Sequence, residues 1–400
     1  MRTTKANWVF SLTILTASAF LMELCFTMIT PFLPVYLVQE LSVPQDQVNM
    51  WSGAIFSITF FISGLMGPVW GVLADLKSRK LMAVRASVCL AITYSLCGAV
   101  SGPGELFIVR FLQGLSAGLY PALLALVATS VPVNKIGLSM GLMQGGMTVG
   151  AIAGPFFGGV LADYFGMRPS FFVAGIALAL VTLMVVFFVK EPPHKPQPKT
   201  KFFDITVLKD PVILRILFCS VVIYAAMFSI QPILPLYLAD LNGSMDNIMV
   251  VAGTVFSICG ISIMIAAPLI GMAGQKFGFS KVLIWCLVAS GLLIMLQLIA
   301  DTVEGFTFVR FLSGFAVAGL IPTVNSLLST HTKEEDRGKI FGWNFLFGHV
   351  GMAGGPMLAG ALAGFCGYAW VIGLSGFILL PLAVFLIFFI RNRKTSSESV

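Results

Sequence analysis

The chain has 400 residues, of which 58% are hydrophobic and only 10% are charged. A soluble globular domain carries about 25% charged residues, so this composition excludes that class. The formal net charge is +7, but the basic residues fall in short clusters between apolar segments. That placement indicates membrane topology and not nucleic-acid binding.

Twelve long apolar segments follow one another along the chain. An α-helix rises about 1.5 Å per residue and the hydrocarbon core is about 30 Å thick, so about twenty residues can span it. We expect spans at 8–37, 49–73, 81–100, 105–130, 137–162, 169–190, 211–238, 248–273, 282–300, 305–330, 339–363 and 368–390. The sequence therefore predicts an all-α integral membrane protein with twelve transmembrane helices.

The first span contains the one acid that lies well inside an apolar segment, Glu23 in FLMELCFTMITPF. A charge at the bilayer centre costs about 2.5–3.5 kcal/mol on insertion scales, so an intramembrane acid is a functional candidate. Burial favours the protonated acid, whereas a nearby arginine favours the carboxylate. The alternative is a structural acid that is hydrogen-bonded to a neighbouring helix.

A charged loop joins the second and third spans, with the spacing Gly71-x-x-x-Asp75-x-x-x-Arg79-Lys80. An acid beside a cationic cluster can pair with basic groups or helix ends nearby. The alternative is the ordinary excess of basic charge in a cytoplasmic loop.

The fourth span carries Arg110 about five residues, or roughly 7 Å, inside its outer end. If Glu23 pairs with Arg110 in one conformation and separates from it in another, Glu23 would release and take up a proton. The alternative is an arginine that extends to the membrane surface. Arg310 repeats Arg110, but Asp301 and Glu304 are close enough in sequence to hold it at the surface.

The fifth span contains the glycine-rich segment GLMQGGMTVGAIAGPFFGG at 141–159. Gly150, Gly154 and Gly158 recur every four residues, so they form a stripe on one helix face along which a neighbouring helix can approach closely. Pro155 removes a backbone donor and is expected to bend the helix. The alternative is a plain packing face without a conformational role.

The second half of the chain repeats the first. Ile108–Gly114, IVRFLQG, recurs 200 residues later as Phe308–Gly314, FVRFLSG, and Pro31 returns as Pro232. We therefore expect two six-helix bundles, at 1–190 and 211–400, joined by a proline-rich linker at 191–210. Duplicated transporters of this kind place their site between the halves near the bilayer midplane.

Charge in the loops predicts the orientation. With both termini in the cytoplasm, the cytoplasmic segments hold Lys77, Arg79, Lys80, Lys135, Lys276, Lys281, Lys333, Arg337, Lys339, Arg391, Arg393 and Lys394. The outer loops then hold Arg168 as their one basic residue, and they carry acids such as Glu40 and Asp163. This asymmetry favours two cytoplasmic termini and an even number of spans.

Three motifs resemble signatures of the major facilitator superfamily. The spacing of Gly141, Gly150, Gly154-Pro155 and Gly158-Gly159 resembles the fifth-helix signature of its proton-coupled drug exporters. Arg110-x-x-Gln113-Gly114 is similar to the fourth-helix signature, whose arginine is implicated in proton coupling. The Gly71–Lys80 loop resembles the superfamily's loop signature, in which Asp75 and Arg79 would latch the halves on the cytoplasmic side. Leu76 and Ser78 depart from that signature, where a basic residue and a glycine are usual.

Over nearly its whole length the chain looks like a member of the twelve-helix drug:proton antiporter branch. Its segments PFLPVYL, GVLADLKSRKLM and RFLQGLSAG are most similar to bacterial exporters linked with fosfomycin, deoxycholate and fluoroquinolone resistance. The resemblance implies export of amphipathic organic compounds by alternating access, driven by the proton gradient without a cofactor. It also implies a monomer in the bacterial inner membrane, with no nucleic-acid partner.

The candidate site residues follow from the polar groups in these spans and from the resemblance. Proton coupling is expected at Glu23 and Arg110, with His349 as a second titratable group. The substrate-cavity candidates are Gln113, Tyr120, Gln144, Tyr224, Gln231, Asn325 and Asn344. The cytoplasmic gate comprises Gly71, Asp75 and Arg79, and the conformational helix motif comprises Gly141, Gly150, Gly154, Pro155, Gly158 and Gly159.

Enzymatic chemistry finds no support in the sequence. It contains no phosphate-binding Gly-Lys-Ser/Thr loop, and its seven cysteines have no metal-ligand spacing. Two alternatives stay open: a carrier of one metabolite, siderophore or lipid, and a membrane sensor that has lost transport.

Overall fold

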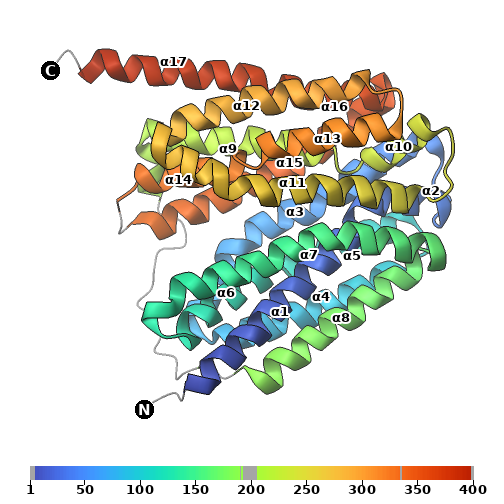
Figure 1. Ribbon diagram of the computed structural model, residues 1–400. Coiled ribbons are helices and arrows are strands. Elements are labelled where there is room, and N and C mark those ends of the chain that lie inside the picture. Colours follow the sequence, from blue (N-terminus) through green and yellow to red (C-terminus); the bar gives the residue numbers. More distant parts are fainter. Residues whose placement is uncertain (1–4, 190, 192–204, 334–335, 398–400) are drawn as a thin grey trace. The chain divides into compact units, whose positions relative to one another are not determined.

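The structure is a computed structural model in which residues 5–189, 191, 205–333 and 336–397 are described (Figure 1). Within these ranges all regular secondary structure is helical, and twelve helical stretches are long and apolar enough to cross a membrane. They comprise Trp8–Gln39, Gln45–Ala74, Arg79–Ala99, Pro103–Ser130, Ile136–Phe165, Met167–Phe188, Pro211–Asn242, Ile248–Phe277, Phe279–Ile299, Val303–Thr330, Arg337–Cys366 and Tyr368–Phe388. The predicted fold class is confirmed.

Several of these spans consist of two consecutive helices. The helices of the first half are α1 (Lys5–Ile29), α2 (Leu33–Gln39), α3 (Gln45–Leu76), α4 (Arg79–Ala99), α5 (Pro103–Leu115), α6 (Leu119–Ser130), α7 (Ile136–Phe165) and α8 (Met167–Phe188). Those of the second half are α9 (Pro211–Ser229), α10 (Leu234–Asn242), α11 (Ile248–Phe277), α12 (Phe279–Leu296), α13 (Val303–Val317), α14 (Leu320–Thr330), α15 (Arg337–Cys366), α16 (Tyr368–Phe377) and α17 (Leu379–Ser397).

The first and seventh spans are interrupted at equivalent places. The α-helix α1 gives way to a short 3₁₀ turn at Thr30–Phe32, and α9 ends one residue before a turn that precedes α10. Each interruption contains a proline, Pro31 or Pro232, which cannot donate a backbone hydrogen bond to the helix before it. In the fourth span the interruption coincides with Gly118, whose φ of +109° favours glycine.

Contacts group the chain into two compact units. Unit 1 comprises Met1–Pro44, Ile58–Phe202 and Asn247–Ser257, and unit 2 comprises Gln45–Ser57, Phe203–Asp246 and Ile258–Val400. The domain limits expected from the repeat, 1–190 and 211–400, divide the protein by position in the sequence, and they remain a prediction. The expected linker at 191–210 lies largely outside the described residues.

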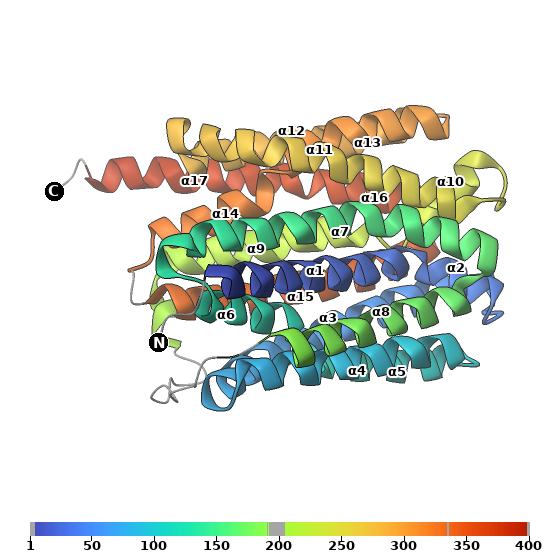
Figure 2. The same cartoon turned by 60° about the horizontal axis from the view of Figure 1, so that its bottom comes forward.

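In unit 1, α1 lies along α7, and both views show the two helices side by side (Figures 1 and 2). The glycines of α7 make this approach possible. A Cβ at Gly150 would lie 2.5 Å from the Phe20 carbonyl oxygen, and a Cβ at Gly154 or Gly158 would overlap the Thr27 hydroxyl or the Met28 carbonyl oxygen. The close approach expected for this stripe is therefore present.

Unit 2 repeats this arrangement with α9 and α15. A Cβ at Gly351 would overlap the carbonyl oxygen of Val221, and one at Gly355 would overlap that of Ala225. Gly351 and Gly355 are the repeat counterparts of Gly150 and Gly154. The same glycine spacing thus produces the same backbone-to-backbone contact in each unit.

Candidate functional site

Glu23 lies in unit 1 on the face of α1 that packs against α7. Its Cβ is 3.3 Å from where a Cβ at Gly150 would stand. The Tyr120 hydroxyl donates a hydrogen bond of 2.8 Å to Gln144 Oε1, which joins α6 to α7. The structure thus places Glu23, Tyr120 and Gln144, which the sequence predicted only as separate candidates, on α1, α6 and α7, three helices that pack against one another in unit 1.

Arg110 is buried in α5, with 3% of its surface exposed. Its Nη1 donates to Gln113 Oε1 over 3.2 Å, and its guanidinium carbon lies 5.9 Å from the centre of the Phe171 ring. Its Nε and Nη2 have no hydrogen-bond partner within the described part of the chain. A buried guanidinium whose N–H groups lack hydrogen-bond partners strongly favours an anionic neighbour.

Glu23 and Arg110 lie on different sides of α1. Two residues after Glu23, a rotation of about 200°, the Cys25 thiol donates to the Ala174 carbonyl oxygen of α8 over 3.7 Å. Arg110 also borders α8, at the Phe171 ring, whereas Glu23 faces α7. Within the described residues no ion pair joins Glu23 to a basic group. The structure therefore holds the separated arrangement, and the paired one stays a prediction.

The remaining proton-coupling candidate, His349, lies in unit 2 on α15. Its Nδ1 donates to the Phe345 carbonyl oxygen over 2.9 Å, and its ring centre is 4.0 Å from that of Phe345. The Tyr224 ring packs against the adjacent Gly348. Gln231 lies in the turn between α9 and α10 and is half-buried.

The two candidate asparagines of unit 2 are directly connected. Asn344 Nδ2 donates to Asn325 Oδ1 over 2.9 Å, which joins α15 to α14. The Ser220 hydroxyl of α9 donates to Asn344 Oδ1 over 2.7 Å. Ser220 was not among the predicted site residues, because a serine in a membrane helix usually forms a hydrogen bond with the backbone of its own helix.

The charged loop between α3 and α4 is held by an acid that the sequence analysis did not select. Glu191 accepts hydrogen bonds from the backbone N–H groups of Arg79, over 2.8 Å, and Lys80, over 3.2 Å, and from the Ser78 hydroxyl. A carboxylate at a helix N-terminus satisfies free donors and interacts favourably with the helix dipole. The Asp75 side chain lies outside the described part of the structure, and Gly71 has open space around it. The gate role of Gly71, Asp75 and Arg79 stays a prediction.

The residues of the conformational motif fall into three groups. Gly150, Gly154 and Gly158 face α1, whereas Gly159 faces the backbone of Met249 at the start of α11, and a Cβ at Gly141 would meet no described neighbouring atom within 4 Å. Pro155 lies inside α7, and its carbonyl oxygen is covered by Gly253. Beyond the motif, the Asp163 carboxylate accepts the backbone N–H of Val250 over 2.8 Å. The C-terminal half of α7 thus holds the first turn of α11 within unit 1.

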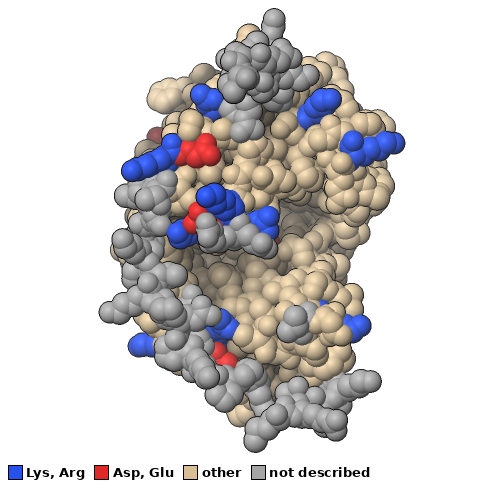
Figure 3. Space-filling model, turned by 90° about the vertical axis from the view of Figure 1, so that its left-hand side faces the viewer, with Lys and Arg blue, Asp and Glu red and all other residues tan. Residues whose placement is uncertain are grey.

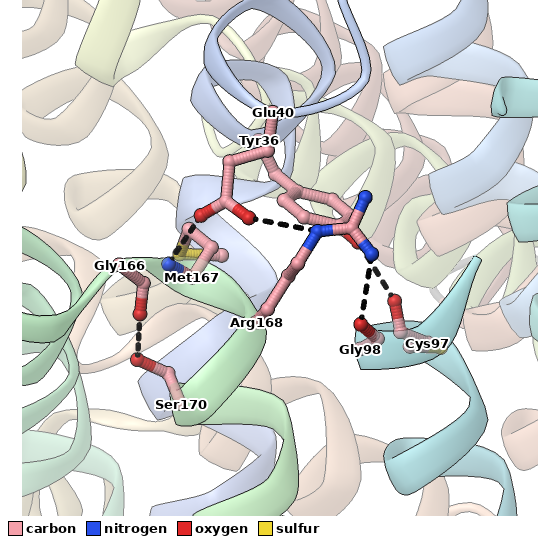
Figure 4. A network of polar contacts seen from close by, with 8 residues as sticks. All are labelled: Tyr36, Glu40, Cys97, Gly98, Gly166, Met167, Arg168 and Ser170. Atoms are coloured by element: carbon pink, nitrogen blue, oxygen red, sulfur yellow. Dashed lines mark hydrogen bonds and ion pairs between the residues drawn. The ribbon is translucent and has the colours of Figure 1, made fainter. Parts of the chain in front are cut away.

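A second network that sequence reasoning missed ties α2, α4 and α8 together (Figure 4). Glu40 Oε2 lies 3.2 Å from Arg168 Nε, and Glu40 Oε1 accepts the backbone N–H of Met167 over 2.6 Å. Arg168 Nη1 donates to the Gly98 carbonyl oxygen, and the Tyr36 hydroxyl donates to that of Cys97. The sequence did contain a feature that could have predicted this network, because Arg168 is the one basic residue expected in the outer loops, which otherwise carry acids.

We expect Glu40→Ala to lower the free energy of unfolding by about 1–3 kcal/mol, because it removes an ion pair and a charged acceptor at the α8 N-terminus. Arg168→Ala should cost less, since this arginine side chain is 38% exposed and exposed ion pairs contribute little. Thermal unfolding of the detergent-purified protein measures both, with the exposed Glu304→Ala as control. Equal losses in all three variants would contradict the role given to Glu40.

Twelve membrane-spanning helices built from two duplicated halves, with polar groups held inside the spans, define a multi-pass transporter. The family model described as Major Facilitator Superfamily matches residues 15–261 and 216–400. The chain belongs to the Major Facilitator Superfamily.

Curated relatives match over almost the full length. The chain is 34% identical over 397 residues to the multidrug resistance protein MdtG of Salmonella arizonae, with 98% of each chain covered. It is 35% identical over 396 residues to MdtG of Salmonella schwarzengrund, again with 98% of each chain covered.

Solved structures share the fold at low sequence identity. A variant of the nucleoside transporter NupG superposes with a TM-score of 0.81 at 15% identity, covering 94% of this chain and 98% of that one. A bacterial homologue of the human lysosomal transporter Spinster gives a TM-score of 0.81 at 16% identity, with 97% and 98% covered. These likenesses support the fold alone.

Proposed function

We propose that this protein exports amphipathic organic compounds in exchange for protons, by alternating access and without a cofactor. The observation that carries the proposal is Glu23, an acid within a membrane span that has no basic partner among the described residues and lies on the face of α1 that packs against α7. Such an acid is expensive to keep in a membrane unless it has a function. The names of the relatives, multidrug resistance proteins, support the substrate class.

The groups around Glu23 suit an amphipathic compound. A carboxylate offsets a positive charge, and Tyr120 and Gln144 offer hydrogen-bonding groups on α6 and α7, the two helices that pack together beside α1. Phe20 lies on the neighbouring turn of α1, and apolar walls with few polar groups are typical of small-molecule sites. A compound and a proton that both need the Glu23 carboxylate would bind in alternation, which is the requirement for exchange.

We further propose a monomer in the bacterial inner membrane, with both termini in the cytoplasm. In unit 1 the start of α1 lies at the left-hand side of Figure 1, which is the face that Figure 3 shows, and Lys and Arg side chains gather on this face. Basic residues concentrate on the cytoplasmic side of membrane proteins. Cysteine labelling of Ser396→Cys against Ser244→Cys, in intact cells with an impermeant reagent, would test this orientation.

The transport test uses inverted membrane vesicles that are energised to an acidic interior and contain a pH-sensitive dye. We expect amphipathic drugs to release protons from vesicles that contain the protein and not from vesicles without it. A panel of drugs and of single metabolites distinguishes a multidrug exporter from a dedicated carrier. Release with one metabolite alone, from correctly inserted protein, would overturn the multidrug proposal.

A further inference from the structure

Ser220, Asn344 and Asn325 form a directional chain of hydrogen bonds across α9, α15 and α14. The Ser220 hydroxyl donates to Asn344 Oδ1 over 2.7 Å, and Asn344 Nδ2 donates to Asn325 Oδ1 over 2.9 Å. Ser220 is 2% exposed and Asn344 is 8% exposed, whereas Asn325 is half-buried. This series of hydrogen bonds therefore begins in the interior of unit 2 and ends at Asn325, a side chain with an accessible surface.

Each bond fixes the orientation of the next amide. Because Asn344 Oδ1 accepts from Ser220, its Nδ2 must point to Asn325, and Asn325 must turn its own oxygen toward Asn344. The Asn325 Nδ2 group, with its two N–H donors, is then the last group in this series of hydrogen bonds. Among the described residues no hydrogen-bond partner of this nitrogen is found.

The repeat shows that the fold does not require these polar groups. An offset of 201 residues relates Pro31 to Pro232 and Pro121 to Pro322, and the same offset relates Ser220, Asn325 and Asn344 to Ala19, Leu124 and Met143. Ala19 and Met143 are fully buried in unit 1. Unit 1 thus fills the equivalent place with apolar side chains, although its helices pack in the same way.

Asn325 lies five residues before the end of its span, which is roughly 8 Å along the helix axis. An amide that faced lipid at this depth would leave its polar groups unsatisfied at a substantial cost. We therefore infer that the accessible N–H groups of Asn325 face a polar passage through the protein, where they meet water or a transported molecule.

We propose that Ser220 and Asn344 are positioning residues that hold the Asn325 amide as a hydrogen-bond donor to an oxygen acceptor of the exported compound. Carbonyl, carboxylate and sulfonyl oxygens have the required chemistry. This inference rests on the proposed export function and adds to it a specificity residue, Asn325, and the two residues that orient it.

The test compares two amphipathic compounds in vesicles that contain the full-length protein. A fluoroquinolone carries carboxylate and ketone oxygens, whereas tetraphenylphosphonium has no hydrogen-bond acceptor. We expect Asn325→Leu, which installs the unit 1 counterpart, to raise the KM for the fluoroquinolone about 3- to 10-fold, as for the loss of one hydrogen bond. The maximal rate, and the KM for tetraphenylphosphonium, should stay unchanged.

The positioning residues need a second set of variants. Ser220→Ala should raise the fluoroquinolone KM about 2- to 5-fold by freeing the Asn344 amide, and Ser220→Thr should restore it because it keeps the hydroxyl. Ser290→Ala is the matched control, since Ser290 is fully buried and its hydroxyl has no partner in the described part of the chain. Tetraphenylphosphonium transport in the same samples reports whether each variant is folded.

The outcomes separate the two proposals. If the wild-type protein moves both compounds and Asn325→Leu changes their KM values equally, the donor role of Asn325 is overturned and the export function stands. If Ser220→Thr fails to restore what Ser220→Ala loses, the positioning role of Ser220 is overturned. If the wild-type protein moves neither compound, the export function fails and this inference fails with it.

Discussion

Replacing Glu23 by glutamine is expected to reduce drug-dependent proton release to the level of vesicles without the protein. Glutamine keeps the size and the hydrogen-bonding capacity of the side chain but has no proton to exchange. The hydrogen bond between Tyr120 and Gln144 does not involve the Glu23 side chain, so the local fold should persist. We therefore expect the variant to keep drug exchange down a gradient while it loses uphill transport.

The measurement combines a pH-sensitive dye with uptake of a radiolabelled drug in the same vesicles. Glu304→Gln is the matched control, because Glu304 is exposed at the first turn of α13. Full uphill transport by Glu23→Gln would exclude Glu23 as the proton carrier. His349 would then be the next residue to replace, since it is the other titratable candidate.

Gly158→Ala is expected to be the most damaging single-methyl change in the protein. The added Cβ would overlap the carbonyl oxygen and the Cγ of Met28, and a backbone carbonyl cannot move aside without shifting α1. Overpacking of this kind costs about 3 kcal/mol, and for a chain of this length we expect the melting temperature to fall by about 3–5 °C. Transport should be lost together with stability, because Glu23 lies in the same contact between α1 and α7.

Gly145→Ala provides the control on the same helix, since nothing lies within 4 Å of a Cβ at Gly145. Alanine favours helix formation over glycine by about 1 kcal/mol, so this variant should be equally or more stable than the wild type. Differential scanning fluorimetry of the purified variants measures the difference. Similar losses at both positions would mean that these glycines supply helix flexibility and not close approach.

Local sequence patterns sufficed for the features that depend on periodicity. Runs of about twenty apolar residues predicted the twelve spans, and the four-residue spacing of Gly150, Gly154 and Gly158 predicted the face that approaches another helix. The spans extend beyond several predicted limits. For example, α3 already begins at Gln45, because a polar first turn outside the apolar run can continue the helix.

Contacts between distant residues could not be predicted in this way. Glu40 and Arg168 are far apart in the sequence, and only the packing of α2 near α8 brings them within 3.2 Å. Glu191 follows the sixth span but caps α4. Among the cavity candidates, the sequence identified Tyr120, Gln144 and Asn325 one by one, while the fold decided which partners they meet.

The duplication has one further consequence, which concerns the residues that have diverged. Glu23 and Tyr224 occupy equivalent positions, and both lie against the equivalent glycines Gly150 and Gly351. One half has thus kept a titratable acid where the other has an aromatic ring, and the second half has amides where the first is apolar. According to the functions proposed here, the first half couples transport to its energy supply, the proton gradient, and the second half selects the ligand. Natural selection can then alter the range of expelled compounds around Asn325 while the energy supply at Glu23 is left intact.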